Sequence, residues 1–309
     1  MSAAVPREGL RGVLPVAPTV FRDDESLDLH GQRRVAEFLV DAGSAAICVL
    51  ANFSEQFSLT DAERLQVLEA TLDQVAGRVP VIVTTSSYSA RITRERNRDA
   101  LQRGAAMVMV MAPFFGATMV VPEDGVLDYF RRVADGLDIE IMLQDAPMSP
   151  TPLPVPLIAR LAREVPQVRH AKIEVPRTAA KVRALRAAAG DDLPGLYDGE
   201  EAVTLVPDLD AGVLATMSSA TVPEALAAVV ARYHAGDRAG AVEAWERVLP
   251  LIHYENRQCG LAAAKILLAE GGVIGSARTR APFPEIGPRT REELLDLARS
   301  RDALALRWA

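Results

Sequence analysis

Cysteine is scarce in this chain, with only Cys48 and Cys259 among 309 residues. The two lie far apart in the sequence, which argues against a structural disulfide and favours a reducing compartment. No signal-like segment precedes Val5 and Pro6, so we expect a cytoplasmic protein. No apolar run approaches the roughly 20 residues that cross a bilayer, and no membrane partner is therefore expected.

Dense runs of lysine or arginine are also missing, and the formal net charge is −7. This charge is unsuited to nucleic acid or an acidic membrane surface, so we expect a small-molecule ligand. The histidines His30, His170, His234 and His253 are scattered, without the spacings typical of metal ligands. No metal site is predicted.

Apolar residues make up 49% of the chain, enough for a large core. Short β-rich runs alternate with longer amphipathic stretches eight times, and the runs span residues 13–19, 46–50, 81–85, 107–111, 139–144, 168–173, 195–197 and 212–216. Strand-helix units of roughly 25 to 35 residues predict parallel pairing, and eight of them predict a closed (β/α)8 TIM barrel of the α/β class. The competing doubly wound sheet usually has a Gly-x-Gly-x-x-Gly loop after its first strand, which is missing here.

Three more helix-like segments follow the eighth unit, at about residues 239–252, 258–270 and 290–300. We therefore expect residues 1–236 to form the barrel that carries the active site, and residues 237–309 to form a C-terminal helical extension. Active sites of such barrels lie where strands end and helices begin. That rule selects the polar residues to consider.

Lys172 is the most unusual of these residues. It lies in Ala171-Lys172-Ile173-Glu174-Val175-Pro176, a short and mostly apolar strand-like run. Burial disfavours the charged form of an ammonium group and can leave the amine free to attack a carbonyl. Side chains alternate along a strand, so Lys172 and Glu174 should point the same way. The pair indicates either catalysis or a salt bridge at the rim of a sheet.

Polar groups follow other predicted strands as well. Asn52 and Ser54 come after the second strand and could bind a carboxylate or carbonyl oxygen, although both are also ordinary loop residues. Gln144 ends the fifth strand and is well placed to bind a ligand. The acids of Asp198-Gly199-Glu200-Glu201 follow the seventh strand, where they could instead favour the N-terminus of the next helix. Ser218 follows the eighth.

Three of these features together resemble the dihydrodipicolinate synthase and N-acetylneuraminate lyase superfamily. They are Asn52-Phe53-Ser54-Glu55 after the second strand, Pro113-Phe114-Phe115 after the fourth, and Lys172 at the end of the sixth. Residues 144–147, 198–201, 253–258 and 306–309 are similar to the L-2-keto-3-deoxyarabonate dehydratase branch. The likeness covers nearly the whole chain and implies a homo-oligomer, either a tetramer or a dimer.

The resemblance implies that Lys172 forms a Schiff base with the C2 ketone of a 2-oxo acid, without a metal or organic cofactor. Relatives have a tyrosine proton relay where this chain has Gln144, so Glu174 becomes the candidate acid-base group. In relatives, hydroxyl groups after the second strand hold the substrate carboxylate. The residues expected to bind substrate here are Asn52, Phe53, Ser54, Gln144, Asp198 and Ser218.

The implied activity is that of a hydro-lyase that dehydrates a 2-oxo-3-deoxy sugar acid, namely L-2-keto-3-deoxyarabonate to 2,5-dioxopentanoate. The sugar acid could differ, because Phe114 and Phe115 stand where the branch is expected to have Tyr-His. One alternative is an aldolase or lyase that cleaves or forms a carbon-carbon bond with pyruvate through the same lysine. Another is a noncatalytic sugar-acid sensor.

Overall fold

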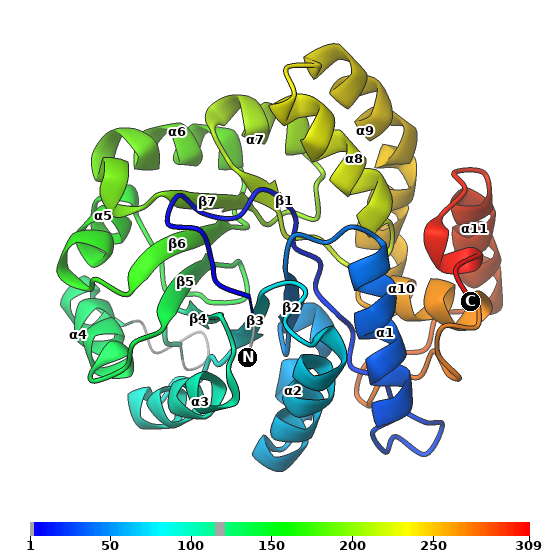
Figure 1. Cartoon of the computed structure of the whole chain (residues 1–309), viewed down its shortest axis with the longest axis horizontal. Coiled ribbons are helices and arrows are strands. Elements are labelled where there is room, and N and C mark those ends of the chain that lie inside the picture. Colours follow the sequence, from blue (N-terminus) through cyan, green and yellow to red (C-terminus); the bar gives the residue numbers. More distant parts are fainter. Residues whose placement is uncertain (1–2, 115–120) are drawn as a thin grey trace.

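The computed structural model describes residues 3–114 and 121–309, so Phe115 lies outside the described residues. It contains an eight-stranded parallel sheet in the order β1-β8-β7-β6-β5-β4-β3-β2. The sheet closes where Val16 bridges Cys48, which confirms the predicted TIM barrel (Figure 1). The strands are β1 (Gly12–Val13), β2 (Ile47–Val49), β3 (Val81–Thr84), β4 (Met107–Met111), β5 (Glu140–Asp145), β6 (Val168–Ile173), β7 (Gly195–Asp198) and β8 (Ala215–Thr216).

Helices surround the strands, and local sequence signals set their ends. Thr60 and Glu63 form the reciprocal capping box that starts α2, and Gly104 ends α3 in the left-handed conformation. The helices that accompany the strands are α1 (Leu29–Asp41), α2 (Asp61–Val75), α3 (Ala90–Arg103), α4 (Glu123–Ala134), α5 (Val155–Glu164), α6 (Thr178–Ala189), α7 (Leu205–Ala211) and α8 (Pro223–His234).

Some predicted boundaries were wrong. The first strand was expected over residues 13–19, but only Gly12–Val13 pairs as a ladder, and Val16 makes isolated bridges to Cys48 and Ser219. Helix α7 was expected to start near Glu200 and instead starts at Leu205. The reason is the backbone of Glu201 and Ala202, whose φ angles of 53° and 64° are left-handed and interrupt a right-handed helix.

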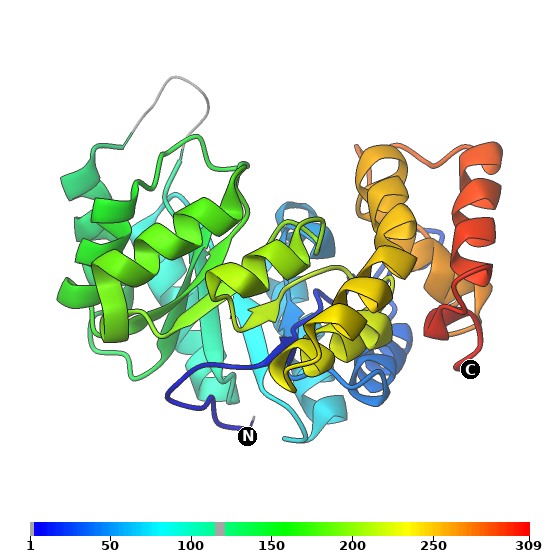
Figure 2. The same cartoon turned by 90° about the horizontal axis from the view of Figure 1, so that it is seen from above.

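The chain after residue 237 forms helices α9 (Arg238–Tyr254), α10 (Ala262–Glu270) and α11 (Pro288–Arg299), with a π-helical turn over Glu255–Cys259. Gly271 caps the C-terminal end of α10. In Figure 2 these helices rise beside the barrel as a separate group. Within the described ranges, no helix combines the length and apolarity that crossing a bilayer requires.

The core has two layers. One lies between the strands and the surrounding helices, and the other fills the barrel interior with Met107, Met109, Met142 and Met217. Tyr197 also belongs to the interior layer and is fully buried. This apolar packing closes the middle of the barrel, so a polar site has room only at an end.

Candidate active site

Lys172 and Glu174 meet at the C-terminal end of β6, as their alternation along the strand predicted. Lys172 Nζ forms an ion pair with Glu174 Oε1, and the exposed side-chain fractions are only 4% and 12%. Gln144, paired with Lys172 across β5 and β6, donates a hydrogen bond of 2.8 Å from Nε2 to the same Glu174 oxygen. Gln144 Oε1 is buried and has no hydrogen-bond partner among the described residues. The three side chains form one cluster with an unused acceptor.

The expectation that burial leaves Lys172 uncharged was wrong for the unliganded protein. Burial is the largest single influence and by itself lowers the pKa of the ammonium group, but the Glu174 and Glu201 carboxylates together outweigh it. The pKa of Lys172 is therefore above its ordinary value. A free amine requires that a carboxylate accept the proton when a carbonyl arrives, and Glu174 is in contact to do so.

Glu201 is a second buried carboxyl beside this cluster, and Glu255 of the π-helical turn is a third. Burial raises the pKa of Glu201 well above its ordinary range, against the opposing influence of Lys172, and Glu255 raises it further. Burial also raises the pKa of Glu255 to about 7. Glu201 accepts a hydrogen bond from the Ser219 backbone N–H, and Glu255 accepts one from Thr221 Oγ1 at 2.7 Å. A buried carboxyl with a raised pKa, which takes up a proton more readily than an ordinary glutamate, thus lies within electrostatic reach of Lys172.

Asp198 holds the loop that carries Glu201. Its carboxylate accepts hydrogen bonds from the backbone N–H groups of Glu200 and Ala202, both at 3.1 Å, and from Thr216 Oγ1 at 2.6 Å. These contacts fix the left-handed backbone at Glu201. The expected contact between Asp198 and substrate stays a prediction, and the geometry gives this residue a positioning task.

Gly199 follows β7 and lies against the Lys172 and Glu174 side chains. A Cβ atom at this position would stand 2.4 Å from Glu174 Cγ and 2.8 Å from Lys172 Cγ, closer than such atoms approach one another. The absence of a side chain at Gly199 therefore lets the Lys172 and Glu174 side chains occupy their places.

The Asn52–Ser54 turn forms another part of the rim, directly after β2. Ser54 Oγ donates to the Ala17 carbonyl at 2.6 Å, so its proton is already engaged. Asn52 Oδ1 accepts from Gln56 Nε2 at 2.6 Å, which leaves Asn52 Nδ2 without a hydrogen bond to another described residue. Phe53 packs against the interior layer of the barrel. The turn thus offers Asn52 as a donor, while Ser54 anchors it.

Ser218 completes the set of residues singled out from the sequence. It is buried just beyond β8, and among the described residues its hydroxyl makes one long hydrogen bond, of 3.4 Å, to the Ser219 carbonyl. That geometry leaves the hydroxyl available for a better partner.

Sequence reasoning did not assign Glu201 or Glu255 to the site. Glu201 follows a strand, yet it was read as compatible with a helix N-terminus, and its left-handed backbone is invisible to helical patterns. Glu255 lies far along the chain in the extension. The sequence signal for both residues was that segments 198–201 and 253–258 are similar to the L-2-keto-3-deoxyarabonate dehydratase branch.

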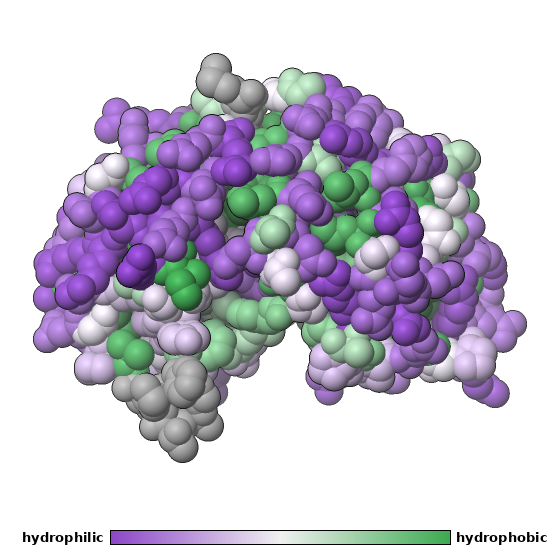
Figure 3. Space-filling model, turned by 90° about the horizontal axis from the view of Figure 1, so that it is seen from below, coloured by the Kyte–Doolittle hydropathy of each residue, from purple (hydrophilic) through white to green (hydrophobic). Residues whose placement is uncertain are grey.

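The surface is hollowed between the barrel and the helical extension, as the outline in Figure 3 shows. Within residues 3–114 and 121–309, no group of three or more His, Cys, Asp or Glu side chains is arranged to hold a metal ion. The chemistry available from the cluster is that of an amine flanked by carboxyl groups, which suits imine formation and proton transfer at carbon.

Comparisons with known proteins agree with this geometry. The model of the "Dihydrodipicolinate synthetase family" matches residues 9–300. L-2-keto-3-deoxyarabonate dehydratase of Azospirillum brasilense is 49% identical over 308 residues, covering 100% of this chain and 99% of that protein. 4-hydroxy-tetrahydrodipicolinate synthase 2 of Streptomyces coelicolor is 29% identical, with coverage of 96% and 97%.

Solved structures give the same picture. The crystal structure of a putative dihydrodipicolinate synthetase from Pseudomonas aeruginosa superposes with a TM-score of 0.89 at 27% identity, covering 95% of this chain and 100% of that one. Since the family model spans nearly the whole chain and the barrel superposes over the same length, the protein belongs to the dihydrodipicolinate synthetase family.

Proposed function

We propose that this protein is a Schiff-base-forming hydro-lyase that converts L-2-keto-3-deoxyarabonate to 2,5-dioxopentanoate. The observation that carries the proposal is the buried Lys172 with Glu174 in contact and Gln144 beside them, in a chain 49% identical to a dehydratase of that name. No step requires a metal or organic cofactor.

The reaction starts at the C2 ketone. Lys172 passes a proton to Glu174 and attacks C2. The C2 oxygen takes one proton from the attached nitrogen and a second from Glu174, and it leaves as water. The resulting iminium acidifies C3, and Glu174 then takes a C3 proton to give an enamine. The first of these transfers uses the contact between Nζ and Oε1 that exists before substrate binds.

The second half of the reaction removes the C4 hydroxyl. Glu201, with its raised pKa, holds a proton and donates it to this hydroxyl, which departs as water while the enamine electrons form a C3–C4 double bond. Glu201, now a carboxylate, takes a proton from C5 while Glu174 gives its proton back to C3, so the double bond shifts to C4–C5 as an enol. The enol takes up a proton at C4 and loses its hydroxyl proton to become the C5 aldehyde, and hydrolysis of the iminium frees Lys172. One water is lost overall, because the water released on imine formation is consumed in hydrolysis.

Substrate recognition divides between two parts of the rim. The Asn52–Ser54 turn takes the carboxylate, through Asn52 Nδ2 and backbone N–H groups. Gln144 Oε1, buried without a partner among the described residues, accepts a hydrogen bond from a hydroxyl of the sugar chain. A substrate without that hydroxyl leaves the acceptor unsatisfied, which is a strong basis for discrimination.

A cytoplasmic homo-oligomer, dimer or tetramer, is part of the proposal. Phe57 and Tyr88 are 60% and 64% exposed and line one pocket formed by the loops that follow β2, β3 and β4. Two exposed aromatic side chains beside a pocket suit a contact between subunits. Light scattering during size-exclusion chromatography measures the assembly. A monomer at micromolar concentration would refute this part alone.

Incubation with synthetic L-2-keto-3-deoxyarabonate tests the function. We expect 2,5-dioxopentanoate, identified by chromatography against a standard. Release of pyruvate instead would establish carbon-carbon cleavage through the same imine. Tight binding without any product would indicate a sensor.

A further inference from the structure

A buried ion pair joins the helical extension to the rim of the barrel. Lys265 of α10 and Glu55, the residue after the Asn52–Ser54 turn, both have fully buried side chains, and Lys265 Nζ contacts Glu55 Oε1. Lys265 also donates to the Arg278 carbonyl at 2.8 Å, and Glu55 Oε2 accepts the Arg280 backbone N–H at 2.8 Å. Both oxygens of Glu55 are therefore held by the extension.

The arrangement is a demanding one. Removing two charges from water costs several kcal/mol per ion, and an apolar pair of similar volume often stabilises a fold equally well. Burial lowers the pKa of Lys265 to about 8, although Glu55 opposes the change. A buried charge pair can hold the chain in one defined geometry, in addition to any effect on stability. The segment that this pair would hold is the turn that ends at Glu55.

Glu55 ends the turn in an unusual conformation. Its φ angle of 57° is left-handed, and its backbone N–H donates to the Asn52 carbonyl at 3.1 Å. A non-glycine residue in this region is strained and persists only when its surroundings fix it. Lys265 and Arg280 hold the Glu55 carboxylate, while Ser58 Oγ donates to the Glu55 carbonyl at 2.9 Å.

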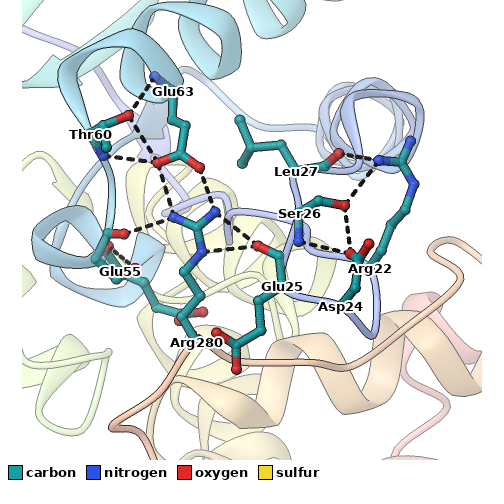
Figure 4. A network of polar contacts seen from close by, with 10 residues as sticks. Arg22, Asp24, Glu25, Ser26, Leu27, Glu55, Thr60, Glu63 and Arg280 are labelled. Atoms are coloured by element: carbon teal, nitrogen blue, oxygen red, sulfur yellow. Dashed lines mark hydrogen bonds and ion pairs between the residues drawn. The ribbon is translucent and has the colours of Figure 1, made fainter.

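Arg280 extends the same attachment. Its guanidinium donates to the Glu25 carbonyl at 2.8 Å and to the Ser58 carbonyl at 2.8 Å, and it pairs with Glu63 (Figure 4). Both cations lie over the Phe21 ring, with Lys265 Nζ 4.5 Å and Arg280 Cζ 4.4 Å from its centroid. Arg280 thus connects the extension to both the loop after β1 and the loop after β2.

We propose that Lys265 and Glu55 are positioning residues for substrate binding, through which the helical extension sets the conformation of the Asn52–Ser54 turn. The inference rests on the proposed function, since the turn is there assigned to the substrate carboxylate. It predicts that loss of the pair weakens binding of the carboxylate and leaves the chemistry at the ketone nearly unchanged.

The test compares two ketones that differ in the carboxylate. Pyruvate has it, and hydroxyacetone presents a ketone without it. Cyanoborohydride traps the imine at Lys172, and mass spectrometry of the intact full-length protein gives the ligand concentration for half-maximal labelling. In Lys265→Met we expect this concentration to rise about tenfold for pyruvate, with a change below about twofold for hydroxyacetone.

Glu224→Gln is the matched control, because Glu224 is another buried carboxyl that joins the end of the chain to the barrel helices, through the Leu304 N–H at 2.9 Å. It should leave both concentrations unchanged. If Lys265→Met does not fold, Glu55→Gln keeps the side-chain shape, removes its charge and carries the same expectation.

Unchanged pyruvate binding in the folded variant, or an equal rise for both ketones, would overturn the inference. The first outcome would mean that the ion pair stabilises the fold without affecting substrate binding. The second would mean that it affects imine formation with any ketone and not recognition of the carboxylate. Failure of the Schiff-base chemistry looks different, since wild-type protein would then take no label from either ketone. A change from dehydration to carbon-carbon cleavage would appear in the product assay and would leave the labelling unchanged.

Discussion

Strand β6 carries two buried polar side chains, His170 and Lys172, two residues apart, and they differ in how completely their surroundings satisfy them. At His170 both ring nitrogens are engaged, Nε2 with Glu140 at 2.9 Å and Nδ1 with the Tyr197 hydroxyl at 3.1 Å. That hydroxyl also accepts the Leu10 N–H at 3.1 Å. This His170 layer lies toward the start of the strand.

The Lys172 layer lies toward the end of the same strand and is left incomplete. Gln144 beside it has a buried acceptor with no partner among the described residues, and burial raises the pKa of the Glu201 carboxyl. A satisfied buried network stabilises one structure, whereas an unsatisfied one has capacity left for a ligand. We therefore expect the His170 layer to contribute to stability and the Lys172 layer to contribute to function. Substitutions in each layer test this division.

Removal of the lysine should have the largest effect. Lys172→Ala eliminates the nucleophile, so we expect turnover to fall by at least about 10³-fold with the fold retained. Steady-state kinetics measures the loss, and circular dichroism checks the fold. Turnover within tenfold of wild type would show that the imine is not part of the reaction.

Gly199→Ala comes next. The added methyl group would stand 2.4 Å from Glu174 Cγ, and displacement of Glu174 and Lys172 should lower kcat/KM by about 10²-fold or more. Gly287→Ala is the matched control, because a Cβ there meets nothing within 4 Å and φ is −61°. Equal kinetics for the two variants would contradict the described packing.

Glu201→Gln should have a smaller effect with a pH signature. Glu201 is an acid whose pKa is raised in the folded protein, so its protonated form is present at low pH and is lost as pH rises through that pKa. The wild-type rate should therefore fall on the alkaline side. In the variant we expect kcat to drop by about 10²-fold and this alkaline fall to disappear. An unchanged pH–rate profile would remove Glu201 from the mechanism.

His170→Phe should have the smallest effect on activity. It breaks the contacts to Glu140 and Tyr197, and we expect the free energy of unfolding to drop by about 1 to 3 kcal/mol. Urea denaturation measures that change, while kcat/KM should stay within about twofold of wild type because the site is untouched. A large kinetic defect without a loss of stability would mean that the two layers are coupled.

The sequence predicted those features that depend on local periodicity. Eight strand-helix units indicated the barrel, and a period of two along β6 brought Lys172 and Glu174 together as observed. The direction of the Lys172 pKa shift was missed because it depends on the balance between burial and two carboxylates, Glu174 and Glu201, and Glu201 comes from the loop after β7. That loop has left-handed residues that no helical or strand pattern encodes. Glu255 was missed because it comes from the extension.

The attachment of the extension was also beyond sequence reasoning. Lys265 and Glu55 lie 210 positions apart, and each looks like an ordinary member of its own helix or loop. Only the three-dimensional arrangement makes them a buried pair. A charged pair could be predicted from the sequence where both partners lie on one strand, as Lys172 and Glu174 do. It could not be predicted where the partners come from different elements, as Lys265 and Glu55 do.

Reduction with borohydride during turnover of L-2-keto-3-deoxyarabonate tests the central claim most directly. Peptide mapping should locate the whole added mass on Lys172, with no label on the buried Lys265 or on Lys181. An unmodified Lys172 in protein that is turning over substrate would contradict the account.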